Sequence, residues 1–193
     1  MDAQTVQNFF NERADGWDAY CHHDAQRLAR ILQEAQLAPG LRILDAACGT
    51  GVLFAPLLQS CPAQLVGLDI SEKMIAVAQQ KYAAPNLCTL AQDLYTYTGT
   101  GFDRVILYSA YPHFADKQAL AQKLYEVLAP GGRFVVAHSE SRHAINGHHT
   151  GPAVCAVSSH LHSAAAECRW FESLFTVDVC VDTDEVYIFS GIK

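Results

Sequence analysis

The feature that most constrains this chain is a glycine-rich turn between a short apolar run and a helix. Residues 41–51 read LRILDAACGTG, so the apolar run ends in Asp45 and the turn contains Gly49 and Gly51. Glycines at these positions let the backbone approach a ligand where a Cβ atom would collide with it. The free N–H groups at the start of the following helix then face that ligand. This order of elements predicts the first half of a nucleotide-binding βαβ unit.

Two common nucleotide-binding motifs fit this turn poorly. The dinucleotide fingerprint needs a third small residue at position 54, where the chain has Phe54. The phosphate-binding P-loop needs a Gly-Lys-Ser/Thr sequence, which does not follow Gly51. A nicotinamide-dependent enzyme is therefore kept only as an alternative that Phe54 disfavours.

A second apolar run, residues 66–68, ends in another acid, Asp69, which falls 18 residues after Gly51. This spacing is close to that at which an acid on the second strand binds the hydroxyls of a ribose. A carboxylate accepts hydrogen bonds from both hydroxyls of a diol and discriminates against a phosphate at the same place. The two acids with the glycine turn between them therefore predict a nucleoside site.

With these two stretches, Asp45–Gly51 and Gly67–Met74, the chain resembles the class I S-adenosylmethionine-dependent methyltransferases over about residues 41–139. The resemblance implies an α/β fold, with a Rossmann-like, doubly wound, mainly parallel seven-stranded sheet, an antiparallel C-terminal hairpin and an N-terminal helical lid. It implies one domain over residues 1–193, with the lid at 1–38, the cofactor-binding core at 41–139 and a substrate loop at 140–163. The implied cofactor is S-adenosyl-L-methionine.

The same resemblance implies which residues bind the cofactor. Asp69 would bind the ribose, and Asp93 would accept a hydrogen bond from the adenine amino group, for which a carboxylate is chemically suited. The remaining implied residues are Asp45, Gly49 and Gly51 at the methionine end, Ile70 and Met74 beside the adenine, and in addition Ala47, Leu94 and Tyr108.

Hydrophobic spacing predicts how the rest of the chain alternates between helices and strands. Such an alternation is typical of a mainly parallel, doubly wound sheet. Asp24 and Ser71 are predicted to be N-caps, and Gly16 is predicted to bend the first helix. The predicted helices are 3–20, 24–35, 52–59, 72–82, 116–128 and 164–174, and the predicted strands after the first are 64–68, 87–91, 102–108, 133–137, 175–181 and 186–192.

Composition limits the kinds of partner that this chain can have. Half of its 193 residues are hydrophobic, which suffices for one sizeable core, and the net charge is −7. No basic run is present to bind a nucleic-acid backbone, and no apolar stretch approaches the ~20 residues that a membrane span needs. The first residues lack the features of a signal peptide, and seven cysteines without a CxxC pair favour free thiols. We therefore expect a cytoplasmic protein with a small-molecule substrate; the sequence leaves its oligomeric state open.

The methyl acceptor is expected at a mouth formed by residues 111–114, residues 138–142 and the N-terminal lid. Methyl transfer from a sulfonium needs a nucleophile placed in line with the S–CH3 bond and protected from water. A base is needed only when that nucleophile must lose a proton, and we expect His113 or His138 to serve. The predicted substrate-binding residues are Trp17, His22, His23, Tyr111 and Arg142.

The histidines of these segments allow three interpretations. They are unrelated surface and pocket residues, or they orient the substrate and accept its proton, since imidazole titrates near neutrality. Alternatively they bind a metal or a metal-containing acceptor, although no closely spaced ligand pair such as HxxxH is present. A non-catalytic protein that binds S-adenosylmethionine and a metal is thus an alternative to the enzyme. The candidate metal ligands are His22, His113, His138 and His149.

Overall fold

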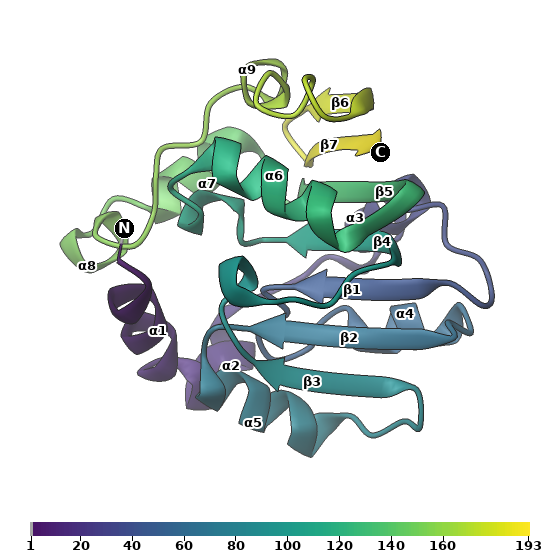
Figure 1. Ribbon diagram of the computed structural model, residues 1–193. Coiled ribbons are helices and arrows are strands. Elements are labelled where there is room, and N and C mark those ends of the chain that lie inside the picture. Colours follow the sequence, from purple (N-terminus) through teal and green to yellow (C-terminus); the bar gives the residue numbers. More distant parts are fainter. Residues whose placement is uncertain (1) are drawn as a thin grey trace.

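A computed structural model describes residues 2–193; residue 1, the first residue of the predicted lid, lies outside the described residues. One seven-stranded sheet with the strand order β3-β2-β1-β4-β5-β7-β6 forms its centre (Figure 1). The first five strands run parallel, and β7 pairs antiparallel with both β5 and β6. This confirms the predicted Rossmann-like sheet with its C-terminal hairpin. The strands are β1 Arg42–Ala46, β2 Gln64–Asp69, β3 Leu87–Ala91, β4 Phe102–Tyr108, β5 Leu128–His138, β6 Thr176–Asp182 and β7 Tyr187–Ile192.

Helices cover both faces of the sheet and the edge at which the parallel strands end. Figure 1 shows α1 lying beyond the arrowheads of the parallel strands, on the same side as α8. No helix within residues 2–193 is both long and apolar enough to cross a membrane. The helices are α1 Ala3–Asn11, α2 Trp17–Tyr20, α3 Ala25–Glu34, α4 Phe54–Gln59, α5 Glu72–Lys81, α6 Lys117–Val127, α7 Arg142–His148, α8 Pro152–Cys155 and α9 Ala164–Cys168, with 3₁₀ turns η1 Ala14–Gly16, η2 Leu94–Thr96 and η3 Tyr111–His113.

Alternation along the strands divides the buried side chains into two cores. On β1, Leu44 and Ala46 pack on the face covered by α6 and α9. Ile43 packs on the opposite face, against side chains of α3, α4 and α5. Parallel strands need such cover on both sides, because few of their residues can face water. The N-caps predicted at Asp24 and Ser71 are present, and each accepts a hydrogen bond from the first turn of its helix.

The bulky Phe54 ring fits against the sheet because Gly67, on the neighbouring strand β2, has no side chain. The fully buried ring lies over Gly67, where a Cβ atom would come within 2.3 Å of Phe54 Cζ. A Cβ atom on Gly51 would come within 2.6 Å of the same ring. Helix α4 therefore packs closely on the sheet despite a large residue at position 54, because Gly67 provides the space that the dinucleotide fingerprint obtains from a small residue on the helix.

Four predicted elements differ from the structure, and one of them is β5, which begins at Leu128 and not at the predicted position 133. The helix predicted over 3–20 is divided into α1, η1 and α2. The predicted loop at 140–163 contains α7 and α8, and α7 is stabilised by Ser141 as its N-cap and by burial of Ile145. The helix predicted over 164–174 ends at Cys168, although turns continue to position 174. These short helices each bury too few side chains to produce a clear helical period in the sequence.

We predict that Gly67→Ala destabilises the fold by about 1–3 kcal/mol, because the new methyl group would overlap the Phe54 ring. Urea unfolding would measure the loss. Gly147→Ala is the matched control, since no atom lies within 4 Å of its added Cβ in α7. Adding Phe54→Leu to Gly67→Ala should cost less than the sum of the two single changes. Strict additivity would show that the two positions do not share this space.

Candidate functional site

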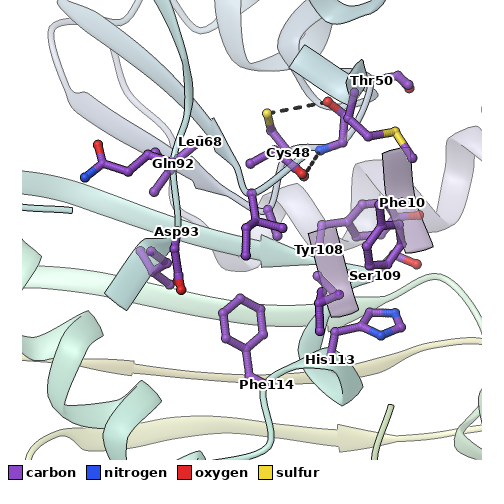
Figure 2. Close-up of a pocket in the computed structure, with 18 of the residues that line it drawn as sticks. Phe10, Cys48, Thr50, Leu68, Gln92, Asp93, Tyr108, Ser109, His113 and Phe114 are labelled. Carbon is purple, nitrogen blue, oxygen red and sulfur yellow. Dashed lines mark hydrogen bonds between the residues drawn. The ribbon is translucent and has the colours of Figure 1, made fainter. Parts of the chain in front are cut away.

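A cavity of about 360 Å³ lies at the edge where β1, β2 and β4 end, within the size range of small-ligand sites (Figure 2). The loop after β1 and the ends of β2 and β4 line it, together with residues that follow β3. The N-terminal segment and the region of η3 complete its walls. No lysine or arginine is among the described side chains that line it, whereas three aspartates, Asp69, Asp93 and Asp116, are.

The carboxylate of Asp69 joins two backbone segments at the base of this cavity. One carboxylate oxygen accepts a hydrogen bond of 2.8 Å from the Gly49 N–H, and the other accepts one of 2.8 Å from the Ser71 N–H. The loop after β1 is thereby tied to the end of β2. Burial raises the pKa of Asp69 to about 6, while the two N–H donors act in the opposite direction.

A second acid, Asp45, lies buried near Asp69 and does not line the cavity. Burial, and then the charge of Asp69, raises the pKa of Asp45 well above its usual range. Its Oδ2 atom has no hydrogen-bond partner within residues 2–193. A buried carboxyl oxygen without a partner is costly, so this site favours a ligand that brings a donor or a positive charge nearby.

The backbone at the strand ends leaves open space for a ligand. Gly49 has a φ of +53°, and apart from its own chain neighbours no atom of residues 2–193 lies within 4 Å of where its Cβ would be. Ala47 and Ser109 line the same cavity and have φ values of 57° and 55°, in the left-handed region that non-glycine residues rarely adopt. Strain of this kind costs about 1 kcal/mol or more per residue and is often found at functional sites.

Most of the residues implied for the cofactor share this one cavity. Asp45 and Gly51 are the exceptions: Asp45 lies behind the wall, and Gly51 packs against the Phe54 ring. The eight that line the cavity are Ala47, Gly49, Asp69, Ile70, Met74, Asp93, Leu94 and Tyr108.

The N-terminal segment contributes one wall through Val6 and Phe10 of α1, Trp17 of α2, and His23. Side-chain hydrogen bonds attach it to the core, in addition to packing of α1 and η1 against α5. They join Gln7 Nε2 to Ile70 O (3.0 Å), Ser71 Oγ to Asn11 Oδ1 (2.7 Å), Thr50 Oγ1 to Asp18 Oδ1 (2.5 Å), and His23 Nδ1 to the Tyr108 hydroxyl (2.7 Å).

Three of the four candidate metal ligands gather near one another. His113 lines the cavity, and its ring centroid is 5.4 Å from that of His149. His138 is buried behind them, and burial lowers its pKa to about 3, with His113 and His149 contributing. Neither His138 Nε2 nor His149 Nδ1 has a partner within residues 2–193. His22 is exposed and does not line the cavity. In the described part of the chain, no group of three His, Cys, Asp or Glu side chains has a geometry that could hold a metal.

Three of the five residues predicted to bind the substrate do not line the cavity: Tyr111, Arg142 and the exposed His22. Tyr111 has no exposed surface, and its hydroxyl donates a 2.7 Å hydrogen bond to Glu167 Oε2 inside the core. Arg142 pairs with Asp182 at 3.0 Å at a separate hollow on the outer surface. A turn residue or a helix-start residue can point to either side of the chain, so the sequence pattern does not determine where Tyr111 and Arg142 lie. Trp17 and His23, in contrast, do line the cavity.

Several lining residues were absent from the predicted site. Tyr95 brings an aromatic ring whose centroid lies 6.0 Å from that of Phe114, a residue of the predicted mouth, and Gln92 and Asp116 add polar groups. Gln92 directly follows β3 at the carboxyl edge, so its position after a predicted strand was a usable signal. Tyr95 and Asp116 depend on the path of short turns, which the sequence pattern does not determine.

Comparison with known proteins agrees with this architecture. Residues 44–136 match the family model described as a methyltransferase domain. Demethylmenaquinone methyltransferase of Thermus thermophilus is 40% identical over 100 residues, which are 49% of this chain and 46% of the relative. Ubiquinone biosynthesis O-methyltransferase of Mesorhizobium japonicum is 36% identical over 118 residues, which are 58% of this chain and 47% of the relative. The chain thus spans about half the length of these curated relatives.

A solved structure shows the same fold over the whole chain. Magnesium protoporphyrin IX methyltransferase from Synechocystis PCC 6803, with bound SAH, superimposes with a TM-score of 0.72. The match covers 100% of both chains at 22% sequence identity. At this identity the similarity establishes the fold alone.

We predict that His138 makes the fold sensitive to acid. Its pKa of about 3 in the folded protein is below the usual value of 6.5, so the unfolded chain binds this proton first. The stability linked to neutral His138 is therefore complete above pH 6.5 and is lost as the pH falls toward 3. Between pH 7 and pH 5, urea unfolding should show wild type losing about 2 kcal/mol more than His138→Leu. Equal losses in the two proteins would contradict this interpretation.

Proposed function

We propose that this chain, a member of the class I S-adenosylmethionine-dependent methyltransferases, is an enzyme. It transfers a methyl group from S-adenosylmethionine to a small molecule. The observation that carries the proposal is the cavity lined by both Asp69 and Gly49, with open space beside the Gly49 backbone. Within this proposal, 41–139 bind the cofactor, the N-terminal segment up to residue 38 covers the site, and 140–163 support the acceptor side.

The chemistry of the donors fits the nucleoside part of this cofactor. Each oxygen of Asp69 accepts one backbone N–H, and each retains a lone pair for a ribose hydroxyl. Asp93 uses Oδ1 to accept the Tyr95 N–H at 2.9 Å, which leaves Oδ2 for an adenine amino group. A nucleoside is thus matched by acceptors at two points of the cavity, and the space above Gly49 lets it approach the backbone.

The charge of the site fits the positively charged part of the cofactor. Burial and the charge of the nearby Asp69 disfavour ionisation of Asp45, and the described residues that line the cavity include no lysine or arginine. A ligand that carries positive charge would offset this unfavourable pairing. A ligand with no positively charged group near these acids would not.

When bound, the cofactor supplies an electrophilic methyl group on positively charged sulfur. The chain's own contribution is to orient the acceptor and to exclude water. The rings of Phe10 and Trp17, 5.6 Å apart in an edge-to-face pair, belong to the wall that does so. His113 lies at the cavity surface, and we assign it, with His138 behind it, to hydrogen bonding on the acceptor side.

Calorimetry tests the cofactor assignment. S-adenosylmethionine and S-adenosylhomocysteine should bind, and NAD should not. Asp69→Asn should weaken both by about 10–100-fold, because hydrogen bonds to a charged group are lost. Asp15→Asn, at an exposed position in η1, is the matched control and should bind as wild type does. Tight binding of NAD alone would overturn the assignment.

Methyl transfer itself can be followed with a methyl-labelled cofactor. Incubation with a mixture of small metabolites, total RNA and total protein should place the label in the low-mass fraction, because the cavity has the dimensions of a small-ligand site. Wild type and Asp69→Asn are compared in parallel. Label that appears chiefly in RNA or protein would contradict a small-molecule acceptor.

A further inference from the structure

We propose that His113 selects the methyl acceptor: its Nε2 accepts a hydrogen bond from the hydroxyl or thiol of an uncharged aromatic molecule. This inference rests on the proposed function and adds to it the chemical class of the acceptor.

The hydrogen bond at one ring nitrogen determines the tautomer of His113. Its Nδ1 lies 2.7 Å from the Val157 carbonyl oxygen, which can only accept. Nδ1 must therefore carry the proton. Burial lowers the pKa of His113 to about 4, so the ring is neutral near pH 7 and Nε2 bears a lone pair.

Nε2 of His113 is left available to a ligand. It has no hydrogen-bond partner within residues 2–193, and the residue lines the cavity. Figure 2 shows the His113 ring below Phe10, and their centroids are 5.0 Å apart in an edge-to-face arrangement. A lone pair here can receive a hydrogen bond but cannot give one, so the complementary ligand group is a donor.

The segment after α8 holds His113 in place from outside the cavity. Besides the Val157 carbonyl, Ser159 donates from its N–H (2.8 Å) and its hydroxyl (3.0 Å) to the Pro112 carbonyl. These three hydrogen bonds fix both the backbone of η3 and the direction of the imidazole. Preorganisation of this kind makes an interaction effective, because little freedom remains to be lost on binding.

The lining around His113 disfavours anionic acceptors. Phe10, Tyr95 and Phe114 line the cavity with aromatic rings, which suit a flat apolar molecule. A carboxylate or phosphate would find no lysine or arginine among the described lining residues and would face Asp116. It would also present no donor to Nε2. An uncharged ring that carries O–H or S–H meets both requirements.

The reaction balances with His113 as the proton acceptor. The lone pair of the acceptor oxygen or sulfur forms a bond to the methyl carbon, and the electron pair of the breaking S–C bond stays on the cofactor sulfur, which becomes neutral. The acceptor proton moves to Nε2 while Nδ1 keeps its bond to the Val157 carbonyl. Because the site disfavours a charged His113, the proton then passes to solvent.

Phenol, anisole and benzoate are the probes that test this inference, each added to protein saturated with S-adenosylhomocysteine. Trp17 lines the cavity, and Trp170→Phe removes the other, exposed tryptophan, so that fluorescence reports on the site. Phenol should bind about 5–10-fold more tightly than anisole, which lacks the donor, and benzoate should bind least. His113→Phe should abolish the difference between phenol and anisole, and His113→Gln, which retains an acceptor, should restore part of it.

Nitrogen-15 NMR of the imidazole gives a second measurement that does not depend on turnover. The His113 signals should show Nδ1–H in the free protein, and Nε2 should shift on adding phenol but not anisole. Equal binding of phenol and anisole, preference for benzoate, or an Nε2–H tautomer would overturn the inference while S-adenosylhomocysteine still bound. Failure of wild type to bind S-adenosylhomocysteine would instead overturn the proposed function, and this inference with it.

Discussion

The site depends on one buried carboxylate that joins two segments of backbone. Asp69 accepts an N–H from the loop after β1 and another from the start of α5, so these loops cannot move independently. Burying a carboxylate is unfavourable, and two backbone donors offset much of that penalty. The arrangement keeps an acceptor with spare lone pairs at the edge of the sheet. The ligand-binding edge is therefore built from the same bonds that close the fold.

The packing below that edge and the space above it are complementary. Phe54 fills the volume that Gly67 leaves on β2, which brings α4 tightly against the sheet. On the cavity side, Gly49 leaves space empty, and Ala47 and Ser109 adopt strained backbone conformations. Tight packing at Phe54 and Gly67 stabilises the fold. This stability allows the neighbouring cavity to contain open space and strained backbone, which are themselves unfavourable.

The sequence predicted best those features that depend on local order. A strand, an acid and a small-residue turn follow one another within a few positions, so Asp69 and Gly49 could be placed without knowledge of the rest. Tyr111 could not be placed, because its direction is set by a hydrogen bond to Glu167, a residue 56 positions later. His113 was singled out as a candidate and lines the cavity, but its tautomer depends on the carbonyl of Val157, which no motif marks. Side-chain direction at turns is a tertiary property.

The N-terminal segment is attached to the core in a way that lets the cavity open without unfolding of the whole protein. Its bonds to the core come from side chains such as Gln7, Asp18 and His23, and none of them belongs to the sheet ladder. Side-chain contacts of this kind can break by local opening at a free energy far below that of complete unfolding. Within the proposed function, passage into and out of the cavity would depend on this local opening and not on unfolding of the sheet. Substitutions in the N-terminal segment could change the rate of ligand entry and release without altering the sheet.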